Sequence, residues 1–182
     1  AVLSVRLFSK VPLPHIRTVA LDTSSLTSVA LTQILLARAY GVRPEYRHAA
    51  PDLDTMLLQA DAALLIGDLG MTAAHPAVVE TRDLGSEWHR YTGLPFVWAL
   101  WLANAETPRQ PLEELLQHGY QWGMAHIDAL VEAESQRTGI PRQRCEHYLK
   151  SVMVYALDDA MLMGLERFLQ ECRHAQLVAG AV

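Results

Sequence analysis

The chain has 182 residues, of which 51% are hydrophobic and 19% charged, so it can bury the core of a globular protein. A net charge of −5 argues against nucleic-acid binding, and no apolar run approaches the roughly 18 residues that a membrane-spanning helix needs. We interpret the two cysteines, Cys145 and Cys172, as buried or incidental thiols, which favours a reducing compartment.

In the first half of the chain, apolar runs alternate with turn residues in a way that predicts strands and helices in turn. Strands are expected at Ala1–Ser9, Thr18–Asp22, Glu45–Ala49, Ala62–Ile66, Val78–Arg82 and Phe96–Ala103. Helices are expected at Val29–Tyr40, Leu53–Gln59 and Leu84–Tyr91. This alternation predicts an α/β fold, with a mainly parallel sheet covered by helices on both faces.

The second half carries helical patterns only, at Leu112–Arg137, Arg142–Tyr155 and Asp159–Leu177. We therefore divide the chain into three parts, taken by residue number. An α/β lobe covers residues 12–93, crossing strands at 1–11 and 94–104 frame it, and a helical tail over 105–182 belongs to another lobe. Two strands that frame a complete lobe are what a two-lobed hinge protein would show.

The segment Thr23–Ser28, with the sequence TSSLTS, joins a buried strand to a long helix. A helix N-cap needs one hydroxyl, and this turn has Ser24, Ser25, Thr27 and Ser28. The free amides and the dipole of a helix N-terminus attract anions, and ligands of open α/β sheets collect at strand carboxyl ends. Two interpretations stay open, a carboxylate or phosphate site and a capping turn with spare hydroxyls.

Gly67 and Asp68 follow the predicted strand Ala62–Ile66, so we expect them at the same edge of the sheet. Glycine lets a backbone approach a ligand closely, and aspartate accepts hydrogen bonds from hydroxyl groups. A Gly-Asp turn that caps the following helix is the simpler interpretation, and the sequence alone favours it.

The sequence supports neither a metal site nor a nucleotide-binding site. The eight histidines are scattered, without the close pairs that metal sites use, so no metal site is predicted. The P-loop, GxGxxG, GxSxG and CxxC motifs are all missing from the sequence. The residues by themselves thus predict an α/β lobe with a small-anion site.

Four stretches together resemble the menaquinone-biosynthesis family of the futalosine pathway, in its chorismate dehydratase branch. They are SVRLFSK (residues 4–10), LDTSSLTSVALTQILL (21–36), DAALLIGD (61–68) and DLGSEWHRYTGLPFVWALW (83–101). The last two are the most specific. The resemblance spans nearly the whole chain and weakens through the helical tail.

The resemblance implies a fold similar to type II periplasmic binding proteins, with two α/β lobes, crossing strands between them and the ligand in the cleft. SVRLFSK and PFVWALWLA would be the crossing segments. Family members carry a further N-terminal segment that builds much of the first lobe. We therefore expect the first lobe to be only partly present in this chain, and the fragment alone to show no turnover.

The resemblance also implies a cytoplasmic lyase without a cofactor, which removes water from chorismate to give 3-[(1-carboxyvinyl)oxy]benzoate. The expected partner is this small dicarboxylate, with no nucleic acid and no membrane, and the oligomeric state stays open. The hydroxyls of Thr23–Ser28 would hold a carboxylate, with the amides of Thr27 and Ser28 foremost. Ser9 and Asp68 are further pocket candidates. No catalytic base is identified, so it comes from the missing segment or from the substrate's own enolpyruvyl carboxylate.

Two other functions are compatible with the same fold. One is the sister enzyme of the pathway, which makes 1,4-dihydroxy-6-naphthoate from a cyclic futalosine, although the IGD and FVWALW segments look less like that branch. The other is a non-catalytic solute-binding protein for small anions, against which the DLG…TGLPF run stands.

Overall fold

The structure is a computed structural model that describes residues 1–177. The chain divides into two units: the first comprises Ala1–Trp98 and Ala156–Val182, and the second Ala99–Tyr155. The strands of the first unit are β1 (Arg6–Ser9), β2 (Thr18–Asp22), β3 (Glu45–Ala49), β4 (Ala62–Leu65) and β5 (Glu80–Asp83). Its helices are α1 (Leu26–Arg38), α2 (Leu53–Gln59), α3 (Gly67–Thr72), α4 (Leu84–Thr92) and α8 (Asp159–His174).

The five strands form one mixed sheet in the order β3-β2-β4-β1-β5. β2 pairs in parallel with both β3 and β4, as the predicted alternation of strands and helices requires. β1 is antiparallel to both of its neighbours, β4 and β5. The connection from β1 to β2 covers residues 10–17, and its one helical element is a 3-10 turn at Leu13–His15, so it is too short for the helical crossover that a parallel return needs. The α/β class is therefore confirmed, and the sheet is mixed.

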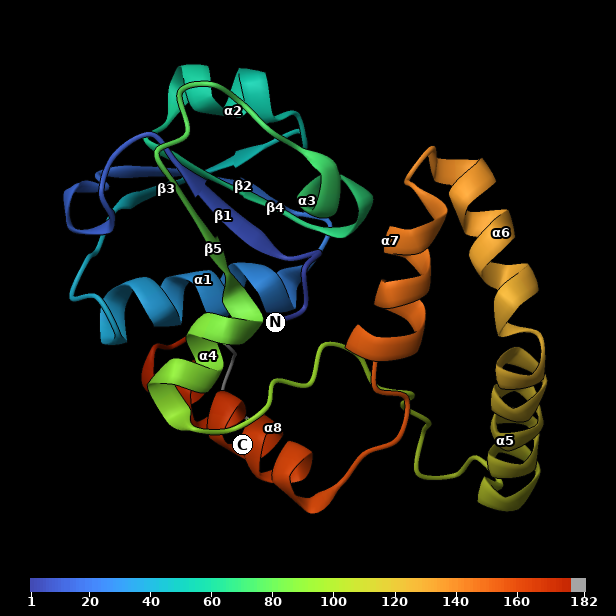
Figure 1. The fold of residues 1–182 in the computed structure, drawn as a ribbon. Coiled ribbons are helices and arrows are strands. Elements are labelled where there is room, and N and C mark those ends of the chain that lie inside the picture. Colours follow the sequence, from blue (N-terminus) through green and yellow to red (C-terminus); the bar gives the residue numbers. More distant parts are fainter. Residues whose placement is uncertain (178–182) are drawn as a thin grey trace. The chain divides into compact units, whose positions relative to one another are not determined.

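Helices cover both faces of this sheet (Figure 1). On one face, Phe8 and Ala63 pack with Met56 of α2. On the other face, Leu7 and Leu64 pack with residues of α1, α4 and α8. Neighbouring strand residues point to opposite faces, so each apolar strand contributes to both cores. The predicted two-sided cover is confirmed.

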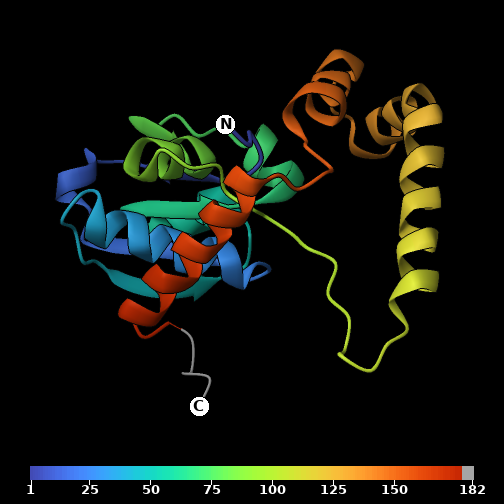
Figure 2. The ribbon, with the colours of Figure 1, turned by 90° about the horizontal axis from the view of Figure 1, so that it is seen from below.

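α8 packs against α1 in the first unit, and Figure 2 shows the two helices side by side. Phe168 and Cys172 of α8 are buried in the same core as Trp88. Glu171, only 6% exposed, accepts a hydrogen bond from Arg167 at 2.8 Å. The tail expected as one block is thus divided, with α8 in the sheet unit. The arrangement of two lobes joined by crossing strands stays a prediction.

The expected strand at Phe96–Ala103 is wrong, because residues 94–104 form neither a strand nor a helix. Phe96 instead packs into an aromatic cluster, with ring centroids 5.5 Å from Trp88 and 4.9 Å from Phe168. Further along, Trp101 is 82% exposed. The first part of the apolar run reflects side-chain packing rather than strand pairing, and hydrophobicity alone does not separate the two.

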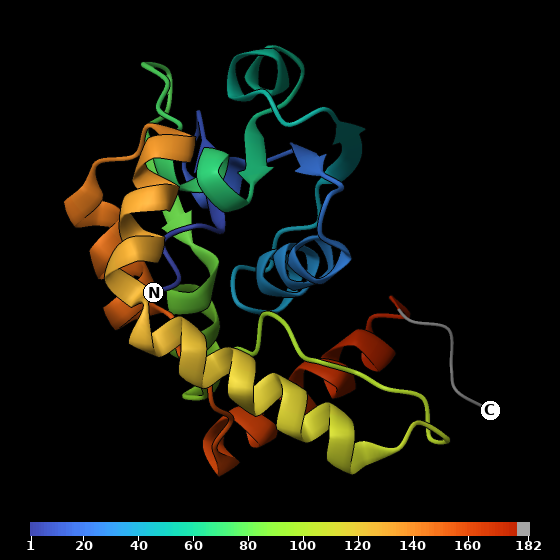
Figure 3. The ribbon, with the colours of Figure 1, turned by 90° about the vertical axis from the view of Figure 1, so that its right-hand side faces the viewer.

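The second unit is helical, with α5 (Arg109–Ala125), α6 (Ile127–Thr138), α7 (Arg142–His147) and a π-helical turn at Tyr148–Val152. The helix expected over Leu112–Arg137 is therefore two helices, and Figure 3 shows the chain bending between α5 and α6. The break falls at His126, whose ring nitrogen lies 2.8 Å from the carbonyl oxygen of Trp122. Among the residues that the structure describes, no helix is long and apolar enough to cross a membrane.

Candidate functional site

Four helix N-termini gather at one edge of the sheet. β2, β3, β4 and β5 all run in the same direction, because β1 is antiparallel to both neighbours. The helices α1, α2, α3 and α4 each follow one of these strands and begin where it ends. We call this side the carboxyl edge. In open α/β sheets it is the edge at which ligands bind.

Most hydroxyls of the Thr23–Ser28 turn are used within the turn. Ser25 is the N-cap of α1, and its Oγ accepts a hydrogen bond from the amide of Ser28 at 3.2 Å and lies 2.9 Å from the Oγ of Ser28. The amide and hydroxyl of Ser24 both donate to Oδ1 of Asp22, at 3.0 and 2.6 Å. The capping interpretation therefore accounts for Ser24 and for the pair Ser25 and Ser28.

Three donors of the turn are left for a ligand. The hydroxyl of Thr27 and the amides of Leu26 and Thr27 have no acceptor within residues 1–177. The amide of Ser28, which we expected to face a ligand, is taken by the N-cap. The anion site that the sequence predicted thus narrows to the first two helical residues and the half-buried side chain of Thr27.

A shallow depression of about 420 Å³ lies where β2 and β3 end. Asp22, Ser24 and His48 contribute to its wall, together with residues 49–51. Asp22 is 2% exposed, and its negative charge disfavours an anion directly beside it. An anion is therefore favoured on the Thr27 side of the turn. Sequence reasoning missed His48, although β3 brings it level with Leu21 of β2.

Gly67 and Asp68 lie at the carboxyl edge, as expected, because β4 is the parallel neighbour of β2. Gly67 has φ = +63°, in the left-handed region that favours glycine, and this lets the chain turn directly from β4 into α3. Asp68 is exposed in the first turn of α3.

At the other end of the carboxyl edge, around β4, β1 and β5, the side chain of Asp83 holds main-chain groups in place. The carboxylate of Asp83 caps α4 by accepting from the amide of Ser86 at 2.9 Å. The same carboxylate accepts from the amides of Val2 at 3.0 Å and Leu3 at 2.7 Å. No role was predicted for Asp83, although it begins the DLG segment on which the resemblance depends.

Arg6 also belongs to this end of the edge, opposite Leu65 and Asp83 in the pairing of β1. Its guanidinium donates to the carbonyl oxygens of Gly70 and Met71 and lies 5.1 Å from the ring centroid of Phe8. The side chain thus connects β1 to the end of α3. No role was predicted for Arg6, because its place in the SVRLFSK stretch is the one feature of the sequence that points to it.

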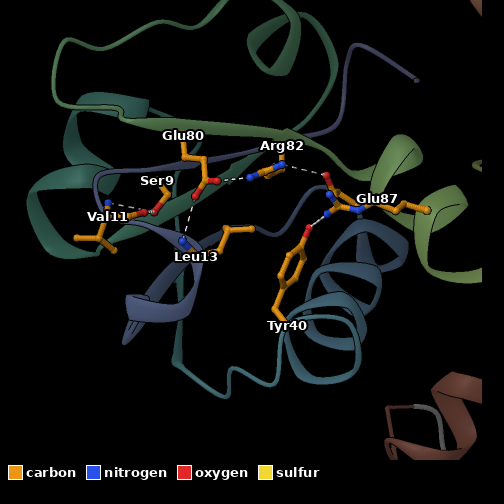
Figure 4. A network of polar contacts seen from close by, with 8 residues as sticks. Ser9, Val11, Leu13, Tyr40, Glu80, Arg82 and Glu87 are labelled. Atoms are coloured by element: carbon orange, nitrogen blue, oxygen red, sulfur yellow. Dashed lines mark hydrogen bonds and ion pairs between the residues drawn. The ribbon is translucent and has the colours of Figure 1, made fainter.

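The structure does not bring Ser9 to the carboxyl edge. Ser9 pairs with Ala62, the first residue of β4, because β1 runs against β4. It is 1% exposed, and its hydroxyl donates to the carbonyl oxygen of Val11 at 2.6 Å (Figure 4). The sequence placed Ser9 in the pocket because it ends a strand, but an antiparallel strand ends at the opposite edge.

Figure 4 also shows a polar network on the α1 side of the sheet. Glu80 accepts from the amide of Leu13 at 3.0 Å and also binds Arg82, whose guanidinium lies 3.8 Å from Glu87. Glu87 accepts a hydrogen bond from Tyr40. Burial and then this bond to Glu87 raise the pKa of Tyr40 to about 12, so the phenol stays protonated. The network joins the end of α1 to β5 and α4, and we interpret its role as stabilising the fold.

The described part of the chain holds no cluster of metal ligands, and its two free cysteines, Cys145 and Cys172, are buried. No three residues of the His, Cys, Asp and Glu types lie close enough there to hold a metal ion. Burial and then the charge of Glu171 raise the pKa of the Cys172 thiol, which makes it a poor nucleophile.

These features define a class: an α/β protein with helix N-termini at one sheet edge and free donors for a small anion. A family model described as menaquinone biosynthesis matches residues 1–174. Chorismate dehydratase from Thermus thermophilus is 36% identical over 184 residues, covering 92% of this chain and 67% of that enzyme. The chain belongs to the menaquinone biosynthesis family.

Proposed function

We propose that this protein dehydrates chorismate to 3-[(1-carboxyvinyl)oxy]benzoate in the cytoplasm, as a lyase of menaquinone biosynthesis. The observation that carries the proposal is the 36% identity to a chorismate dehydratase over 92% of the chain. The free donors at the start of α1 are suited to one carboxylate of such a substrate. The two-lobed fold of type II periplasmic binding proteins, with the carboxyl edge facing the cleft, is part of the proposal.

The reaction removes a proton from ring carbon C3 of chorismate and hydroxide from C4, and together they leave as water. The electron pair of the C3–H bond becomes the new C3–C4 double bond, and the ring becomes aromatic. The ring carboxylate is conjugated to C3 through the C1–C2 double bond, so it takes up negative charge as the proton leaves. Donors that bind this carboxylate more strongly as its charge grows lower the barrier.

The hydroxyl of Thr27 and the amides of Leu26 and Thr27 are the donors that we assign to the ring carboxylate. They stand at the positive end of the α1 dipole, where an anion is favoured. Ser24, Ser25 and Ser28 keep the turn in shape through their bonds to Asp22 and to each other. Gly67 and Asp68 complete the pocket beside β4, with Asp68 accepting a hydrogen bond from a hydroxyl of the substrate.

His48 is the imidazole that lines the depression, but it is poorly placed to act as the general base. Its side chain is exposed, and no described residue hydrogen-bonds to its ring to orient it. A catalytic imidazole is usually held by a second group. We therefore assign the proton to the enolpyruvyl carboxylate of the substrate itself, which is attached through an ether oxygen to the carbon that loses it.

The proposal is tested by incubating the full-length protein with chorismate and following formation of the substituted benzoate by its absorbance and mass. We expect turnover without an added cofactor. A protein that binds chorismate without making product would be a solute-binding protein. Turnover of a cyclic futalosine, and none of chorismate, would identify the sister enzyme.

A further inference from the structure

The segment Val2–Val5 precedes β1 and lies at the carboxyl edge, on the β5 side. Leu3 has φ = +64°, a left-handed conformation that is unfavourable for any residue with a Cβ atom. Such a conformation persists only where surrounding contacts hold it. Here Asp83 accepts a hydrogen bond from the amide of Leu3 itself, at 2.7 Å, and one from the amide of Val2.

The same segment contacts α3, which begins with Gly67 and Asp68. A Cβ on Gly70 would lie 2.7 Å from the carbonyl oxygen of Leu65 and closer still to that of Ser4. The main chain at Ser4 therefore packs directly on the α3 backbone, in a space that only glycine leaves open. A shift of Val2–Ser4 would change the support on which α3 rests.

We propose that Asp83 is a positioning residue: by anchoring the amides of Val2 and Leu3, it holds the segment Val2–Ser4 against Gly70 and thereby fixes the pocket wall at Gly67 and Asp68. Asp83 touches no substrate in this role and acts through the main chain. The role in catalysis rests on the proposed dehydration of chorismate, whereas the anchor itself is independent of it.

The variant Asp83→Ser tests the hydrogen bonds to Val2 and Leu3 separately from the N-cap of α4. Serine is a good N-cap, so its one oxygen can still accept from the amide of Ser86 and keep α4 in place. It has no second oxygen to replace Oδ2, which accepts from Leu3. Asp158→Ser is the matched control, because Asp158 caps α8 through the amide of Met161 and has no bond to Val2 or Leu3.

Hydrogen exchange of the backbone amides and steady-state kinetics on the full-length protein give the two readouts. In Asp83→Ser we expect exchange at Leu3 to accelerate at least tenfold and kcat/KM to fall about tenfold or more, mainly through kcat, with α4 still protected. Asp158→Ser should leave both quantities unchanged. Asp83→Asn, which keeps the shape but presents one acceptor fewer, should also accelerate exchange at Leu3.

Unchanged exchange at Leu3 in Asp83→Ser and Asp83→Asn would overturn the anchor. Faster exchange with an unchanged kcat/KM would overturn the positioning role. If the wild-type protein turns over no chorismate, the proposed function fails, while the exchange measurement still decides whether Asp83 holds Val2 and Leu3.

Discussion

The two ends of the carboxyl edge are built differently. At the β2–β3 end, hydroxyl side chains and His48 line an open depression, and the donors of Leu26 and Thr27 are left free in the described chain. At the β4–β1–β5 end, Asp83 holds main-chain amides, and two backbones touch at Gly70. The first end is suited to contact with a ligand and the second to rigidity. A substitution should therefore act through binding at one end and through the fold at the other.

Gly70→Ala should have the largest effect. The added Cβ meets two carbonyl oxygens of the main chain, which cannot turn away as a side chain can. Overpacking of this kind costs about 1–3 kcal/mol, and we expect the upper part of that range in urea unfolding. Gly119→Ala is the control, since nothing lies within 4 Å of a Cβ there and alanine favours the α5 helix. Equal stability of the two variants would contradict the close contact at Gly70.

Thr27→Ala tests the open end. Loss of a hydrogen bond to a charged group costs about 1.5–3 kcal/mol, so we expect kcat/KM for chorismate to fall roughly tenfold to a hundredfold. Thermal stability should change little, because no described residue uses the hydroxyl. Thr27→Ser, which keeps the hydroxyl, should retain most of the activity. Full activity in Thr27→Ala would remove Thr27 from the site.

His48→Gln should have a smaller effect on the same end. If His48 only lines the depression, kcat/KM should fall less than tenfold, and the dependence of kcat on pH should keep its shape. A loss of a hundredfold or more, together with a change in the shape of that pH dependence, would show that His48 is the base after all.

Asp52→Asn should have the smallest effect. Hydrogen bonds from Thr55 hold the pKa of the Asp52 carboxyl below its usual value, at the cap of α2. A lowered pKa in the folded state stabilises the protein above the unfolded value of roughly 4, and this contribution is lost as the pH falls through the folded pKa. The small difference in Tm between wild type and variant should therefore vanish in acid. A difference that persists at low pH would show that the charge of Asp52 is not its origin.

Much of the first unit could be predicted from residue patterns. The strand from Thr18 to Asp22 and the helix from Leu53 to Gln59 have the predicted bounds, because apolar period and turn residues agree there. The apolar run Phe96–Ala103 misled, since aromatic side chains look the same whether they pack in a cluster or in a strand. Ser9 misled for another reason, because strand direction does not follow from the strand's own residues.

The candidate site, like the fold, could be predicted only in part from the sequence. The turn TSSLTS was recognisable because caps and helix N-termini have local signatures. The sequence did not predict which hydroxyls remain free, because the bonds of Ser24 to Asp22 and of Ser25 to Ser28 form only once the turn is folded. The contacts of Arg6 and Asp83 were not predicted, because their partners, Gly70 and Leu3, lie far away along the chain.

By itself, the sequence determined the α/β class, the family and the position of the hydroxyl-rich turn before α1, because these depend on local patterns and on whole motifs. Only the tertiary structure decided the antiparallel course of β1, the packing of α8 on the sheet unit and the contacts of Asp83 with Val2 and Leu3. Each of these depends on strand order and on contacts between distant segments, and those arise only when the core forms.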